Sequence, residues 1–256
     1  MSEWWTYRPH DFLMFSPRIY WRLFESINTA WWPLAALLAC TAGGWLISVA
    51  RHAGGGAARK AGHAPHGSWQ VALLWPLALL AVAWAVVALA FLRERYMPIF
   101  WAAEVAVWAF LVQAAGWLLM ARLGRPDEDR GAVEPEVGGI PAQRRRTGLL
   151  LGVVALLPYA ALAPLSGRPW LQAELFGLAP DPTVLFSLAV LLLLPQPARA
   201  SPGARRLARA LWVLPITWCL CSSATLALLG SWQAALPVGA AALAWWACRP
   251  RRAAGP

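Results

Sequence analysis

The sequence predicts an all-α fold, a polytopic membrane helix bundle, and three observations lead to that class. Hydrophobic residues make up 59% of the 256 residues and charged residues 13%, against about 45–50% and about 25% in soluble domains. Tryptophan, a residue enriched at membrane interfaces, occurs 18 times. Apolar runs of about 20 residues, the length that crosses a bilayer, alternate with short basic segments. This pattern excludes a soluble nucleic-acid-binding protein, a secreted disulfide scaffold and a disordered chain.

The N-terminal segment, residues 1–28, is too polar to cross a membrane and predicts an interfacial amphipathic helix. Ser16 followed by Pro17 is typical of a helix start, with serine as the N-cap and proline in the first turn. At about 100° per residue, the charged side chains share one face (Arg18, Arg22, Glu25) and apolar side chains the opposite face (Ile19, Tyr20, Leu23, Phe24, Ile27). We expect the apolar face to rest on the outer leaflet. A docking surface for a partner protein is the alternative, and its candidate residues are Trp4, Trp5, Tyr7, Arg8, Tyr20 and Trp21.

About seven transmembrane helices are predicted in residues 29–248. The expected spans are 31–50, 69–92, 96–121, 147–167, 182–198, 210–229 and 232–248. The last two come from one uncharged stretch, 210–248, which is too long for a single crossing and is divided near Gly230. Without that division the chain has six spans.

Basic residues predict the orientation of these spans. An odd number of crossings places the termini on opposite sides of the membrane. Of the 22 Arg and Lys residues, 16 lie in segments on the same side as the basic C-terminal tail, residues 249–256. Because Arg and Lys concentrate in cytoplasmic loops, we expect the N-terminus outside and the C-terminal tail in the cytoplasm.

Glu104 is the one ionisable residue well inside a predicted span, and it is the candidate intramembrane polar site. A charge at the centre of a membrane helix costs about 2.5–3.5 kcal/mol, so such residues face the bundle interior. The expected partner is a neighbouring helix, or Arg93 or Arg95 at the nearby turn. A proton- or cation-coupling site and a contact with a partner protein are the other interpretations.

The sequence contains no pattern that predicts catalysis, a cofactor or a metal centre. The motifs of serine hydrolases, zinc proteases, P-loop proteins and dinucleotide-binding proteins do not occur. His52, His63 and His66 share one glycine-rich loop but match no ligand spacing. Cys219 and Cys221 point about 200° apart on a helix, so they do not predict a shared metal. We expect no enzymatic activity, no cofactor, no metal and no nucleic-acid partner.

The start of the chain resembles a known family. The run SEWWTYR at residues 2–8, followed by residues 11–13 and 15–18 and by Tyr20, resembles the opening of a family of bacterial multi-pass membrane proteins, the domain of unknown function DUF6064. The match covers mainly residues 2–33. It implies a protein of the bacterial inner (cytoplasmic) membrane and carries no activity or catalytic residue to this chain.

Two functions fit these observations. The first is a non-catalytic accessory or assembly subunit of a larger bacterial membrane complex, with a respiratory or photosynthetic electron-transfer assembly as one context. Its partners would be the lipid bilayer and other membrane protein subunits. The alternative is a small-solute or proton-coupled transporter that uses Glu104. Prolines inside the predicted spans, at positions 76, 158, 215 and 237, suggest helix kinks that a transporter could use as hinges.

Overall fold

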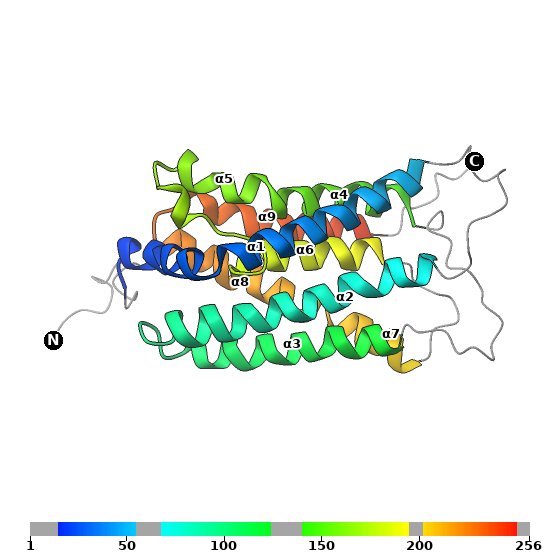
Figure 1. Ribbon diagram of the computed structural model, residues 1–256, viewed down its shortest axis with the longest axis horizontal. Helices are drawn as coiled ribbons and strands as arrows, with labels where there is room; N and C mark the ends of the chain where they lie inside the picture. The colour runs from blue at the N-terminus through cyan, green and yellow to red at the C-terminus, as the bar shows by residue number, and fades with distance from the viewer. Residues whose placement is uncertain (1–14, 55–67, 124–139, 195–201, 250–256) are drawn as a thin grey trace.

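The structure is an all-helical bundle, as the sequence predicts. The computed structural model describes residues 15–54, 68–123, 140–194 and 202–249, and these ranges contain no β-strand. Figure 1 shows the long helices running side by side along the long axis of the molecule. In chain order the helices are α1 (Pro17–Gly54), α2 (Ser68–Val86), the π-helix η4 (Val87–Tyr96), α3 (Ala103–Leu123), α4 (Ala142–Leu156), α5 (Pro158–Leu165), the 3-10 helix η6 (Trp170–Gln172), α6 (Pro180–Leu193), α7 (Pro202–Ala210), α8 (Val213–Leu228), the 3-10 helix η7 (Trp232–Ala234) and α9 (Ala235–Cys248).

Four helices are long and apolar enough to cross a membrane. They are α1, α2 together with η4, α3, and α7 together with α8. The pair α4 and α5 makes a fifth if the two helices, bent by 46° relative to each other, form one span. The helix α6 is apolar but has only 14 residues. An all-helical bundle with four or five helices that could cross a membrane is therefore confirmed, whereas seven spans stay a prediction.

The prolines of the predicted spans have different effects on the helices. Pro158 begins α5 directly after the bend, because its ring clashes with the preceding turn and it lacks an N–H donor. Pro215 and Pro237 lie in the first turns of α8 and α9, where the N–H of a residue has no helical partner in any case. Pro76 lies inside α2. Pro237 therefore does not interrupt α9, whereas Pro215 lies inside the span formed by α7 and α8, shortly after the break between these two helices.

The helix α1 joins the predicted interfacial segment to the predicted first span. It continues without interruption from Pro17 to Gly54 and contains Pro33. Its first turns do not form a separate helix, because their apolar face packs against the rest of the bundle and buries Tyr20, Phe24 and Ile27. The sequence pattern predicted this face but not its partner, which is protein rather than the outer leaflet.

Aromatic rings fasten the start of α1 to the end of η4. Phe15 stacks on Tyr20 with ring centroids 5.8 Å apart and contacts Tyr96 edge-on. Phe24 stacks on Phe91 at 5.0 Å. Aromatic pairs of this kind contribute about 0.5–1.5 kcal/mol each beyond the area they bury, so this cluster holds one end of the bundle together.

The short helix α6 is the centre of the bundle. All of its residues are buried, and it packs against α2, α4, α8 and α9. Figure 1 shows α6 in yellow between the surrounding helices. Glycine allows the close approach of α4, since a Cβ added at Gly148 would lie 2.7 Å from Cγ of Leu193. Small residues at helix contacts are typical of membrane bundles.

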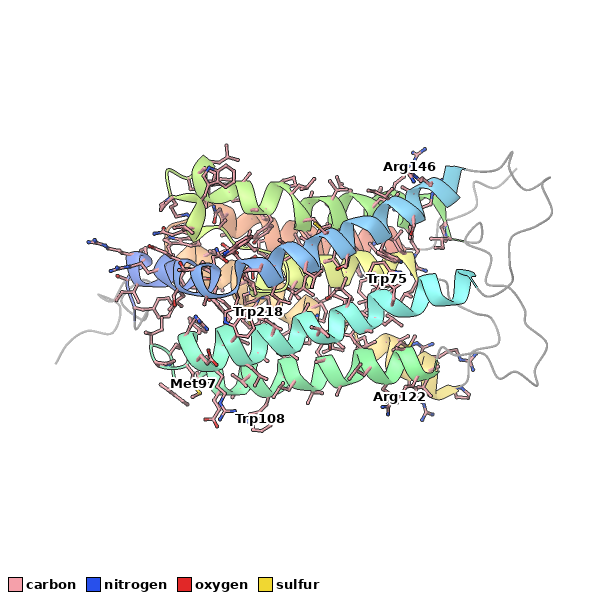
Figure 2. The ribbon with its side chains drawn as sticks, in the orientation of Figure 1. Trp75, Met97, Trp108, Arg122, Arg146 and Trp218 are labelled. Atoms are coloured by element: carbon pink, nitrogen blue, oxygen red, sulfur yellow. The ribbon has the colours of Figure 1, made fainter. Side chains whose placement is uncertain are left out.

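The two ends of the bundle differ in their loops. In Figure 1 α1 begins at the left end and α9 ends at the right end. Figure 2 shows Arg122 and Arg146 at the right end and Met97 at the left end. The two residues that flank the predicted cytoplasmic segment 122–146 therefore lie at the same end of the bundle as the end of α9.

Candidate functional site

Between η6 and α6 the chain enters the bundle without helical structure. Residues 173–179 are buried apart from Leu175, which is half-buried. Gly177 has a φ of +80°, and a Cβ at this position would collide with Leu38 of α1, so only glycine fits. Its N–H donates to Oγ1 of Thr183 over 2.9 Å, and this hydroxyl donates to the carbonyl of Ala179 over 2.7 Å. These bonds satisfy polar groups at the buried start of α6.

Asp181, in the first turn of α6, is a buried carboxylate with three hydrogen-bond donors. Tyr159 of α5 donates to Oδ2 over 2.9 Å and Ser222 of α8 donates to the same oxygen over 2.6 Å. Nε1 of Trp218 donates to Oδ1 over 2.8 Å. The side chains at 218 and 222 are one helical turn apart and share a face of α8. One carboxylate therefore joins α5, α6 and α8.

Glu174 is a second buried acid, in the non-helical segment before α6. The residue is only 3% exposed. Its carboxyl group has no hydrogen-bond partner in the part of the chain that the structure describes. Burial raises the pKa of Glu174 well above its usual value, and the nearby charge of Asp181 raises it further, whereas Arg168 lowers it. These surroundings favour the neutral form of the acid over the ionised form.

Arg168 acts electrostatically on Glu174, but its side chain is held by other groups. Its guanidinium sits 3.5 Å above the ring of Trp21, a cation–π contact with α1. Its NH2 group donates to Oε1 of Gln233 over 3.2 Å and its NH1 group to the carbonyl of Gln172 over 3.3 Å. The Nε of Arg168 is buried and has no partner among the described residues. The guanidinium of Arg168 therefore keeps one donor without a partner among the described residues.

An asparagine of α1 fixes the backbone directly before Glu174. The Nδ2 of Asn28 donates to the carbonyl oxygens of Leu171 and Ala173 over 2.8 and 2.7 Å. Gln172, between them, donates to Oε2 of Glu25 over 3.1 Å. The first turns of α1 thus position the segment that carries Glu174. We call the two acids with Tyr159, Arg168, Trp218 and Ser222 the carboxylate site.

Glu104 does not belong to the carboxylate site. Its side chain is exposed in the first turn of α3, so the expectation that it faces the bundle interior is wrong. The physical reason is that α3 begins only at Ala103, which puts Glu104 at the end of the helix instead of within it. Charged side chains near a helix end extend to the membrane surface at low cost.

The predicted docking residues divide into two groups. Tyr20 is buried in the aromatic cluster, and Trp21 is partly covered by Arg168. These two residues therefore stabilise the bundle instead of forming an open surface. The other four, Trp4, Trp5, Tyr7 and Arg8, lie outside the described residues, as does most of the predicted tail.

The described residues do not bring the candidate metal ligands of the sequence into one site. Cys219 is buried whereas Cys221 is exposed, so the two thiols point to opposite sides of α8, as their spacing predicts. The side chains of His52, His63 and His66 lie outside the described part of the chain. Among the described residues no group of three or more His, Cys, Asp or Glu side chains could hold a metal ion.

Comparison of the chain with protein-family models, curated proteins and solved structures finds no match. The function is therefore inferred from the chemistry of the carboxylate site. The fold and the site together define a helical bundle whose long apolar helices could cross a membrane, with one acid in the first turn of its central helix and a second acid in the segment before it.

Proposed function

We propose that this protein is a proton-coupled transporter of a small solute, with the carboxylate site as its proton-binding site. One observation carries this proposal: Glu174 is buried without a hydrogen-bond partner among the described residues, beside a second buried acid, Asp181. Ionisable groups inside membrane bundles are costly and mark ion or proton pathways. We therefore assign the proton-binding role of the transporter hypothesis to Glu174 and Asp181 instead of Glu104.

The shape of the site supports the proposal. Non-helical backbone at membrane depth occurs where it is buried in protein or lines a cavity, and transporters bind substrates at such broken helices. Asp181 lies 12 residues before the end of α6, about 18 Å at 1.5 Å per residue. That distance is more than half of a hydrocarbon core of about 30 Å. With the end of α6 at the cytoplasmic boundary, as the proposed topology has it, Asp181 would lie inside the hydrocarbon core.

A purely structural role explains Asp181 but not Glu174. Three donors compensate the buried Asp181 carboxylate. A buried acid without a partner costs stability, and an apolar side chain of the same size would pack there at lower cost. Its presence is therefore better explained by a proton that binds and leaves.

Transport of a solute with protons is the direct test. The full chain is reconstituted in proteoliposomes, and solute-evoked currents are recorded under a pH gradient with cations, amino acids and sugars. We expect a current with one class that is lost in Glu174→Gln and in Asp181→Asn. Glu104→Gln is the matched control, since it makes the same change at an exposed acid and should keep the current. A current that survives Glu174→Gln would overturn the proposal, as would its absence with every class.

We further propose seven crossings of the bacterial inner membrane, with the N-terminus outside and the C-terminus in the cytoplasm. Support comes from the positive-inside rule and from the common end of Arg122 and Arg146 (Figure 2). It also comes from the seven successive helical segments of the described residues, which are α1, α2 with η4, α3, α4 with α5, α6, α7 with α8, and α9. The shortness of α6 does not oppose it, because α6 is shielded from lipid on all sides. Alkaline phosphatase fused after residue 97 should be active, and a fusion in the 199–209 segment inactive. The reverse pattern would contradict this orientation.

The accessory-subunit hypothesis stays a second proposal, favoured by the outer face of α3. Exposed apolar side chains follow each other there at heptad spacing, and Figure 2 shows Trp108 pointing away from the bundle. The stripe consists of Trp101, Val105, Trp108 and Val112. Such spacing is typical of helix–helix contacts. It agrees with a partner helix from another subunit.

The two proposals are separated by mild-detergent purification followed by native mass spectrometry. If α3 binds a partner, a second protein should co-purify in a fixed ratio and be lost after Trp108→Ala with Val112→Ala. Trp245→Ala, at an exposed tryptophan of α9, should leave that ratio unchanged. A chain that is purified alone, or a partner that survives the α3 changes, would contradict the subunit proposal.

A further inference from the structure

Four arginines gather where the short helix α7 meets the end of α3. Three of the nine residues of α7 are arginines, Arg205, Arg206 and Arg209, and all three are exposed. Arg122, the second-to-last residue of α3, is exposed as well. Figure 1 shows α7 beside the end of α3, and Figure 2 shows Arg122 at that end. We call these four residues the arginine patch.

Contacts between α3 and α7 fix the two helices side by side. Nε2 of Gln113 donates to the carbonyl of Leu211, directly after α7, over 2.9 Å. A Cβ added at Gly116 would lie 2.9 Å from Leu211 and 4.0 Å from Leu207, so the two helices run antiparallel. Arg122 comes six residues after Gly116, about 9 Å further along α3. It is therefore level with the first turns of α7, which carry two of the arginines of that helix.

The described part of the chain does not balance the charge of the arginine patch. None of its four side chains forms an ion pair or a hydrogen bond with a described residue. Arg205 and Arg209 are four residues apart on α7, and like charges at this spacing destabilise a helix. Arg206 and Arg209, three residues apart, repel each other in the same way. A bound anion would offset this repulsion.

The length of the span that contains α7 places the arginine patch among lipid headgroups. The helices α7 and α8 together form one apolar span of 27 residues, about 40 Å at 1.5 Å per residue. A hydrocarbon core is about 30 Å thick, and the bilayer with its headgroup regions about 40–45 Å. The first turns of α7 therefore extend beyond the hydrocarbon core but not beyond the headgroups. An exposed arginine at this level faces lipid phosphates.

We propose that the arginine patch binds an anionic phospholipid with two phosphate groups, of the diphosphatidylglycerol class. A guanidinium binds a phosphate through two parallel hydrogen bonds. Four guanidinium groups exceed what one phosphodiester with a single negative charge can pair, whereas two phosphodiesters on one glycerol pair with two arginines each. Basic sites between membrane helices are typical of such lipid binding. The inference rests on the proposed membrane crossing of α7 with α8 and is independent of transport by the carboxylate site.

The test is a lipid titration of the full chain in mild detergent, followed by native mass spectrometry. The probes are diphosphatidylglycerol, phosphatidylglycerol with its single phosphate, and zwitterionic phosphatidylethanolamine. We expect one diphosphatidylglycerol per chain. It should bind about 25-fold more tightly than phosphatidylglycerol, because the second phosphate engages two more arginines at about fivefold each. Equal affinity for the two anionic lipids, or for phosphatidylethanolamine, would overturn the proposal.

Variants assign the binding to the arginine patch. The triple change Arg205→Gln, Arg206→Gln and Arg209→Gln should weaken binding of diphosphatidylglycerol about 100-fold. Arg209→Gln alone should weaken it about fivefold, which keeps the test open if the triple variant does not fold. The matched control removes three exposed arginines at the opposite end of the bundle and should bind as the wild type does. Its changes are Arg18→Gln, Arg22→Gln and Arg93→Gln. An equal loss in the control would overturn the proposal.

Two further measurements separate the lipid from other anions. Millimolar inorganic phosphate should leave the lipid bound, and its displacement would show a site for free phosphate instead. The acidic residues Asp127 and Asp129 follow α3 in the sequence. Asp127→Asn with Asp129→Asn should leave the lipid affinity unchanged. A rise of about tenfold or more would show that this segment of the chain occupies the arginine patch, and it would overturn the proposal.

Discussion

Tyr159→Phe removes one hydrogen bond from Asp181 and changes little else. The hydroxyl donates to Oδ2 over 2.9 Å, both side chains are buried, and phenylalanine keeps the ring in place. A hydrogen bond to a charged group contributes about 1.5–3 kcal/mol in soluble proteins, whereas hydrogen bonds between membrane helices average about 0.6 kcal/mol. The donors favour the ionised form of Asp181, against the effect of its burial, and two of them remain in the variant. We therefore expect the free energy of unfolding to fall by about 1.5 kcal/mol, the lower end of the charged range.

The assay is equilibrium unfolding in mixed micelles, followed by circular dichroism as the fraction of denaturing detergent rises. In an Asp181→Asn background the acceptor is neutral, so the same change should cost about 0.6 kcal/mol or less. Tyr96→Phe is the matched control, because no hydrogen bond of its hydroxyl to another described residue is found. Equal losses in the two backgrounds would refute the assignment of the energy to this hydrogen bond. A loss from Tyr96→Phe as large as that from Tyr159→Phe would refute it as well.

Three further changes have defined outcomes in the same unfolding assay. Gly177→Ala should lower the free energy of unfolding by about 2–5 kcal/mol, since it combines backbone strain with overpacking. Gly230 has a φ of +67° but open space around it, so Gly230→Ala should cost only the strain of about 1–2 kcal/mol. Similar losses for the two variants would contradict this comparison. Burial raises the pKa of Glu174, so the folded state binds that proton more tightly than the unfolded chain does. The stabilisation of the folded state by this proton is complete below about pH 4.5 and is lost as pH rises through the raised pKa of Glu174. If Glu174→Gln kept the same dependence of the free energy of unfolding on pH, Glu174 would not be the group responsible. Glu104→Gln, at an exposed position, should stay within about 0.5 kcal/mol of the wild type.

The sequence predicts the positions of most helices because they follow from apolar runs. Hydropathy alone indicates that α2, α3 and α4 lie near 69–92, 96–121 and 147–167. The continuity of α1 could not be predicted in the same way. A polar stretch followed by an apolar stretch predicts two separate elements in two environments. In the structure both stretches belong to one helix, because its first turns pack against the rest of the protein.

The carboxylate site was missed because its acids lie in what the pattern indicates to be a loop. Glu174 and Asp181 fall between the predicted spans 147–167 and 182–198, where acids are ordinary solvated residues. One signal was present, since the span after them is unusually short, and short or interrupted apolar segments are typical of binding sites in transporters. The donors Tyr159, Trp218 and Ser222 come from distant segments. Only the tertiary structure brings them to one carboxylate.

The wholly buried position of α6 has a consequence for how the protein is made. Its 14 residues amount to about 21 Å, too short to partition into the bilayer alone during synthesis. Asp181 also emerges from the ribosome before Trp218 and Ser222, so at that moment only Tyr159 can pair with it. Insertion of α6 therefore has to wait for α8. A chain truncated after residue 210 should leave α6 exposed to membrane quality control, even though every residue of that helix has been translated.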